Sequence, residues 1–164
     1  MLTGDMLRRS PERFPDKPSV LWQGTSLTYR ELNAQANRLA HALLGLGLGK
    51  GAKVAMLSRN RAEYGVVFFG VARTGYVLTN VSVLYAPDEL AYVLDKADAE
   101  ALIHEDVFAE KVQAVLGRLP KLKHRIVIGT AQDGALPFVD FLSGQPDTTP
   151  EVAIDEDDPF SMTY

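Results

Sequence analysis

The chain has 164 residues, of which 46% are hydrophobic and 23% are charged, and 17 basic against 21 acidic side chains give a net charge of −4. That length suits one domain with a hydrophobic core, or part of a larger domain, and the balanced charge argues against nucleic acid or an anionic membrane surface as a partner. Because there is no cysteine, disulfides, thiolate zinc sites and cysteine nucleophiles are excluded.

The N-terminal stretch lacks the apolar segment of a secretory signal, and no charge-free run is long enough to span a bilayer, so we expect a soluble, cytoplasmic protein.

The first elements expected are a hairpin and a long helix. Residues 19–22 and 26–29 are short strand-like runs that predict a hairpin. Thr28 and Glu31 then form a capping box, and apolar residues at helical spacing predict a helix over 28–44.

Helices and strands alternate through the middle of the chain. We expect Gly45 to end the first helix in a left-handed conformation. Asn60 and Glu63 predict a second capping box, Pro87 marks the first turn of a third helix, and Asp106 opens a fourth. The strands expected between these helices are 53–57, 76–81, 100–104 and 125–129.

This alternation, with strands rich in Val, Ile and Leu, is typical of parallel βαβ units. We therefore predict an α/β fold over residues 1–130, with a mostly parallel sheet and helices on both of its faces. Residues 131–164 contain an Asp-Gly pair, several prolines and no sustained period. They are predicted to form an irregular linker with a short helical turn.

The glycine run at 45–51 resembles a phosphate-binding loop at first sight. A dinucleotide loop follows a strand and opens a helix, so that helix N–H groups face the phosphate. Here the order is reversed, because a predicted helix precedes the run and a predicted strand follows it. The spacing also matches neither G-x-G-x-x-G nor the P-loop pattern. The run is interpreted as a turn and not as a nucleotide site.

No catalytic, cofactor-binding or metal-binding residue is predicted from the residues themselves. His41, His104 and His124 are scattered and have no second ligand at metal spacing. Ser58 follows a strand but lacks the G-x-S-x-G elbow of a nucleophile. The acidic run at 155–158 is interpreted as a solvated linker rather than a cation site.

Motifs in a specific order carry a resemblance that covers nearly the whole chain. They are Pro-Asp-Lys-Pro-Ser-Val at 15–20, Thr-Tyr-Arg-Glu-Leu at 28–32, Gly-Ala-Lys-Val-Ala at 51–55, the asparagine-led stretch 60–103, and DEDDPFSMTY at 155–164. Together they resemble the N-terminal lobe of the AMP-forming acyl-CoA synthetases and their adenylate-forming relatives. In that family, the last of these stretches leads into the loop that binds the ATP phosphates.

The resemblance implies a ligase that uses Mg²⁺, ATP and CoA to turn a carboxylic acid, expected to be a fatty or similar apolar acid, into an acyl-adenylate and then a CoA thioester. Tyr164 lies where the phosphate loop would begin, so we expect an inactive N-terminal fragment. One position departs from the family: Leu84 stands where many members carry an arginine that the resemblance assigns to the CoA phosphate. An apolar side chain cannot make that contact, and no site residue is carried over.

Two alternatives remain open: a stand-alone, non-catalytic interaction module derived from such a ligase, or the lobe of a sibling adenylation enzyme. We also expect self-association, since the surface that the rest of such an enzyme would cover is expected to stay open.

Overall fold

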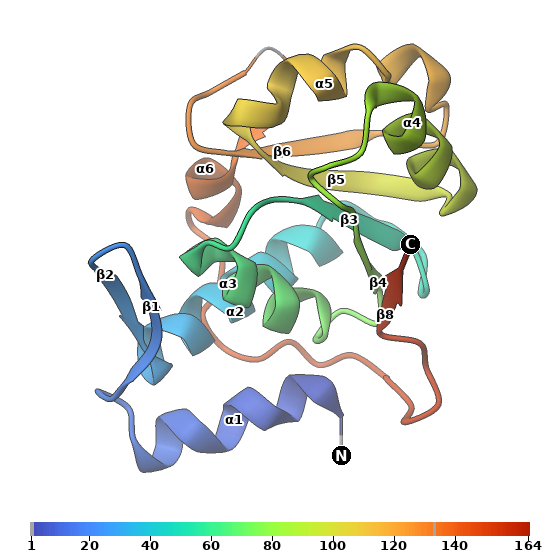
Figure 1. Cartoon of the computed structure of the whole chain (residues 1–164). Coiled ribbons are helices and arrows are strands. Elements are labelled where there is room, and N and C mark those ends of the chain that lie inside the picture. The colour runs from blue at the N-terminus through green and yellow to red at the C-terminus, as the bar shows by residue number, and fades with distance from the viewer. Residues whose placement is uncertain (1, 133) are drawn as a thin grey trace. The chain divides into compact units, whose positions relative to one another are not determined.

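The computed structural model describes residues 2–132 and 134–164 (Figure 1). The chain forms two compact units, and each of them is assembled from segments that are distant in sequence. Among the described residues, no helix is both long enough and apolar enough to cross a membrane. The first unit holds the residues up to Gly51, Asn60–Tyr76 and Leu142–Phe160, and the second holds Ala52–Arg59, Val77–Phe141 and Ser161–Tyr164.

The first unit contains three helices and a two-stranded hairpin. The predicted hairpin is confirmed, and its turn residues Gln23 and Gly24 have positive φ angles of 43° and 80°, which suit a two-residue turn between twisted strands. The elements are α1 (Thr3–Arg13), β1 (Pro18–Trp22), β2 (Thr25–Thr28), α2 (Tyr29–Leu44) and α3 (Ala62–Val71).

Helix α1 was not predicted from the sequence. Its only large apolar side chains are Met6, which is 57% exposed, and Leu7, which is buried as Gly4 is. Pro11 also lies inside it. Proline in a helix usually argues against one, since it removes a backbone donor. Packing within the unit therefore outweighs the weak local signal.

The start of α2 is as predicted. The side chain of Thr28 accepts a hydrogen bond of 3.2 Å from the backbone N–H of Glu31, and the Thr28 N–H donates to the Glu31 carboxylate at 2.8 Å. Two backbone N–H groups that the helix cannot satisfy are thereby paired.

The end of α2 differs from the prediction. Gly45 is right-handed, with φ −62° and ψ −18°, and the first left-handed residue is Gly47 at φ +70°. The helix tightens before it ends, because Leu46 and Gly47 donate to carbonyls three residues back. The glycine run is still a turn between a helix and a strand, as predicted.

The predicted cap at Asn60 is wrong. The residue before α3 is Arg61, whose backbone is extended and whose side chain makes no capping hydrogen bond. Its guanidinium instead bonds the Glu63 carboxylate at 3.2 Å and lies 5.1 Å from the centre of the Trp22 ring. The Glu63 side chain, which the capping pattern would have used, is thus paired with the Arg61 guanidinium instead.

A buried arginine joins the helices of the first unit. Arg73, only 4% exposed, donates from Nη1 to Asn37 Oδ1 at 2.6 Å and from Nη2 to Asn33 Oδ1 at 2.8 Å, both on α2. It also reaches the backbone carbonyl of Gly4 on α1 at 3.4 Å. Burial lowers the pKa of Arg73 to about 10, and neutral amide acceptors surround the charge.

The second unit is built on a six-stranded sheet in the order β7-β6-β5-β3-β4-β8, and all of its pairs are parallel. The predicted α/β class and parallel sheet are confirmed, with the four long strands within two residues of their expected limits. The strands are β3 (Lys53–Leu57), β4 (Val77–Asn80), β5 (Ala99–Glu105), β6 (His124–Ile128), β7 (Leu136–Pro137) and β8 (Ser161–Thr163).

One face of this sheet is covered by helices of the same unit (Figure 1). Helix α4 (Pro87–Lys96) begins at its proline as predicted. The fourth predicted helix is broken into a 3₁₀ turn at Asp106–Phe108, α5 (Ala109–Gln113) and a second 3₁₀ turn at Leu116–Arg118. The buried core between these helices and the sheet consists of Ala55, Leu57, Val81, Leu90, Ala91, Val93, Leu94, Ala99, Leu102, Val112, Val115 and Leu119.

The C-terminal segment takes part in both units. Residues 131–164 supply β7, the short helix α6 (Phe138–Leu142) and β8. Between these elements, the backbone carbonyl of Asp147 accepts from Asn37 Nδ2 at 2.6 Å. The final strand then pairs with β4 through Leu78 and Ser161. An irregular segment with no period can therefore still have fixed partners.

Candidate functional site

A buried carboxylate lies at the carboxyl end of the second unit's sheet. Strands β3 and β5 are parallel neighbours with Leu57 opposite His104, so the residues that follow β3 come beside Glu105. Ser58 Oγ lies 3.1 Å from Glu105 Oε1, and the backbone N–H of Arg59 donates to the same oxygen at 2.5 Å. Open α/β sheets bind ligands at this edge.

The environment of Glu105 holds it as an anion. Its side chain is fully buried, which alone would raise its pKa, but hydrogen bonds from Arg59 and Ser58 outweigh burial and leave the pKa lowered. The Arg59 guanidinium donates to Oε2 at 2.8 Å. A carboxylate with this many donors is a poor proton acceptor, so Glu105 fixes the loop after β3 rather than acting as a general base.

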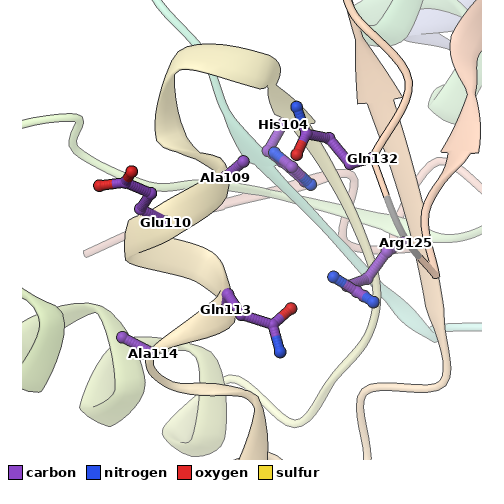
Figure 2. A pocket seen from close by; sticks show the side chains of 7 residues that line it. All are labelled: His104, Ala109, Glu110, Gln113, Ala114, Arg125 and Gln132. Carbon is purple, nitrogen blue, oxygen red and sulfur yellow. The ribbon is translucent and has the colours of Figure 1, made fainter.

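A pocket of about 630 Å³ lies beside α5 in the same unit. We call it the α5–β6 pocket; its polar lining consists of His104, Glu110, Gln113, Arg125 and Gln132. Two small residues, Ala109 and Ala114, complete the lining and leave room beside the helix. Figure 2 shows Arg125 and Gln113 pointing toward the same space, whereas the carboxylate of Glu110 points away from it.

His104 is the buried member of this pocket, at 1% exposed. Its Nδ1 lies 2.9 Å from the backbone carbonyl of Glu105. A carbonyl oxygen only accepts, so Nδ1 carries the proton. Burial, helped by the charge of Arg125, lowers the pKa of His104 and keeps the ring neutral. Nε2 is then an acceptor, and it has no hydrogen-bond partner among the described residues.

The loop that contains Leu84 is held in place by a lysine. Lys111 Nζ donates to the backbone carbonyls of Val83 at 2.9 Å and Tyr85 at 2.7 Å. The Tyr85 hydroxyl donates to the Tyr164 carbonyl at 2.7 Å. Leu84 itself is 89% exposed. The loop therefore presents an apolar side chain to solvent at residue 84, the position compared with an arginine in the sequence analysis.

The other residues singled out in the sequence have places in the fold rather than in a common site. His41 Nε2 lies 2.8 Å from a backbone carbonyl of the C-terminal segment, and His124 opens β6. The acidic run at 155–158 pairs with Lys50, whose Nζ lies 2.6 Å from Asp158 Oδ2. Within the described part of the chain, no group of three or more His, Cys, Asp or Glu is arranged to hold a metal ion.

The sequence predicted neither the contacts of Glu105 with Ser58 and Arg59 nor the α5–β6 pocket. A signal existed for the first one, since Ser58 and Glu105 come at the ends of two predicted strands, and the ends of neighbouring parallel strands meet. The strand order was needed to know that these two strands are neighbours. The α5–β6 pocket had no such signal, because it depends on how the residues after Asp106 turn back over the sheet.

Comparison with known proteins agrees with this architecture. The profile of the AMP-binding enzyme family matches residues 7–164. A medium/long-chain fatty-acid–CoA/3-oxocholest-4-en-26-oate–CoA ligase of Mycobacterium marinum is 36% identical over 153 residues, which cover 90% of this chain and 27% of the relative. A long-chain fatty-acid–CoA ligase of Escherichia coli O6:H1 is 35% identical over 115 residues, or 70% of this chain and 20% of the relative.

Solved structures give the same result. An anthranilate CoA ligase in complex with anthranoyl-AMP superposes with a TM-score of 0.94 and 30% identity, over 98% of this chain and 31% of that one. A fatty acyl CoA synthetase of Mycobacterium tuberculosis superposes with a TM-score of 0.87 and 26% identity, over 99% of this chain and 32% of that one. The chain spans about a quarter of the length of the curated relatives it matches, within their N-terminal portion. It belongs to the AMP-binding enzyme family.

Proposed function

We propose that this chain forms the N-terminal part of an acyl-CoA ligase that acts on a fatty or similarly apolar acid. The observation that carries the proposal is the 36% identity to the Mycobacterium marinum ligase over 90% of the chain. In the proposed reaction, the carboxylate attacks the α-phosphorus of Mg²⁺-bound ATP, giving acyl-AMP and pyrophosphate. The CoA thiol then attacks the acyl carbon, and AMP leaves as the thioester forms. ATP and CoA are cytoplasmic metabolites, so we propose a cytoplasmic setting.

The proposed role of this chain is to form part of the ligase domain. Arg59, Ser58 and Glu105 fix a loop at the ligand-binding edge of the sheet. Residues 131–164 are proposed to lead toward the loop that binds the ATP phosphates. We assign no residue of this chain to ATP, Mg²⁺ or CoA, and the exposed, apolar Leu84 does not suit a phosphate.

The 164-residue chain alone is proposed to be inactive. It covers 27% of that relative, and Glu105, which lies 3.1 Å from the Ser58 hydroxyl, is a poor proton acceptor. Purified chain should release no pyrophosphate above blank when incubated with Mg-ATP, CoA and a panel of fatty acids. Robust turnover would contradict the proposal.

A chimera tests whether this chain can serve as the N-terminal part of an active acyl-CoA ligase. The matched N-terminal segment of the Mycobacterium marinum ligase is replaced by this chain, and the same segment is deleted in a control. We expect the chimera to form acyl-CoA and the deletion to be inactive. A folded but inactive chimera would favour the alternative, a non-catalytic module.

We also propose that copies of this chain associate with one another. Strand β8 ends the sheet order beside β4, and an edge strand offers backbone groups for pairing with a second copy. A specific dimer would bury more than about 1,000 Å². Sedimentation across a range of concentrations should show a dimer or larger species, and a monomer throughout would contradict this.

A further inference from the structure

We propose that the α5–β6 pocket binds a small organic anion that also carries a hydroxyl or amine group. Binding at this pocket does not depend on the function proposed above. Three features of the pocket support this: its volume, the charged and amide groups that face it, and His104 Nε2, which has no hydrogen-bond partner among the described residues.

The pocket has the size of a small-molecule site. Its volume of about 630 Å³ falls within the range of ~300–1,000 Å³ typical of ligand pockets. On the α5 side the pocket is lined by Ala109 and Ala114, whose short side chains leave its volume open. The pocket lies wholly within the second unit, and its lining comes from β5, β6, α5 and residues that follow α5 and β6.

The charge of the pocket favours an anion. Arg125 from β6 points into the space, and the side-chain amide of Gln113 from α5 points toward it from the opposite wall (Figure 2). A guanidinium pairs well with carboxylate or phosphate oxygens, and the Gln113 amide can add a donor. The carboxylate of Glu110, which belongs to the described lining, points away from Arg125 and Gln113 (Figure 2).

His104 offers a ligand in the pocket a hydrogen-bond acceptor, its Nε2 atom. His104 Nε2 is buried and has no partner among the described residues, while Nδ1 is engaged with the Glu105 carbonyl. With Nδ1 protonated and the ring neutral, Nε2 can only accept. An unpaired buried acceptor costs free energy that a hydroxyl or amine would recover. An anion without such a group would leave this nitrogen unpaired.

Binding to the 164-residue chain should be measured by calorimetry, with amide and imidazole ¹⁵N spectra to locate the site. The probes are 3-hydroxybutyrate and glycerol 3-phosphate, which distinguish a carboxylate from a phosphate ligand. Butyrate and glycerol serve as controls, since each lacks one of the two features. We expect saturable binding of at least one hydroxylated anion, with shifts at His104 and Gln113, and about tenfold weaker binding of the controls.

Arg125→Gln should weaken binding by about tenfold or more, as expected for a lost charged hydrogen bond. Arg118→Gln is the matched control, because it removes the same charge from an arginine that pairs with Asp88 outside the pocket. It should change affinity by less than about twofold. The proposal is overturned if neither anion binds saturably, if Arg125→Gln binds as the parent chain does, or if the spectral changes lie away from the pocket.

Discussion

The carboxylate of Glu105 accepts a 2.5 Å hydrogen bond from the backbone N–H of Arg59, a residue 46 positions earlier in the chain. The guanidinium of Arg59 completes the contact at 2.8 Å, although that side chain is 59% exposed. A fully buried acid thus anchors the loop that follows the neighbouring strand.

Glu105→Gln should destabilise the chain by about 1–3 kcal/mol, because an amide replaces a buried charged acceptor and turns donors toward Arg59. Urea unfolding measures the loss. Glu110→Gln, at an exposed position, is the matched control and should be near neutral. Equal effects of the two changes would show that the buried contact contributes nothing specific.

The stabilisation by Glu105 should depend on pH. Because its pKa is lowered in the folded chain, its contribution is present above the ordinary value of 4.5 and is lost as pH falls through the lower folded value. The stability gap between the parent chain and Glu105→Gln should therefore narrow from neutral pH to about pH 3. Urea melts at both pH values test this, and an unchanged gap would contradict it.

Thr28→Ala should cost about 1 kcal/mol, because it leaves a helix N–H without its partner. Asn60→Ala should cost little, since no capping hydrogen bond forms at the start of α3. Denaturant melts of the two variants compare a real cap with an apparent one. If Asn60→Ala proves the more damaging, the start of α3 is misassigned.

The glycine turn should tolerate substitution unevenly. Gly47 has φ +70°, so Gly47→Ala forces a side chain into the left-handed region at about 1 kcal/mol or more. Gly49 is not left-handed and a Cβ there would meet nothing within 4 Å, so Gly49→Ala should be neutral or slightly stabilising. Thermal unfolding of both variants decides, and similar losses would place the left-handed turn elsewhere.

Arg73 and Asn37 should be energetically coupled. Each substitution to Ala should cost about 2–4 kcal/mol, because a buried charge or its amide acceptor is left unpaired. The double variant should lose less than the sum of the single losses, since both remove the same contact. A double-mutant cycle in urea measures this, and simple additivity would contradict the coupling.

Local chemistry in the sequence determined several elements. Thr28 and Glu31 define the start of α2 because a capping box needs only residues three apart. Pro87 marks the start of α4 because its fixed φ and missing N–H suit a first turn. The alternation of apolar strands with helices was enough to predict the α/β class and the parallel sheet.

Tertiary structure decided the features that depend on partners distant in sequence. The pairing of β8 with β4 joins Ser161 to Leu78, and a three-residue strand carries no periodicity by which to predict it. Glu105 is an anchored anion, and His104 Nε2 has no hydrogen-bond partner in the part of the chain that the structure describes, because the strand order and the turns after β5 place particular groups around them. Burial and hydrogen bonding set the chemistry of such groups. These arise from strand pairing across the chain, which the local sequence does not encode.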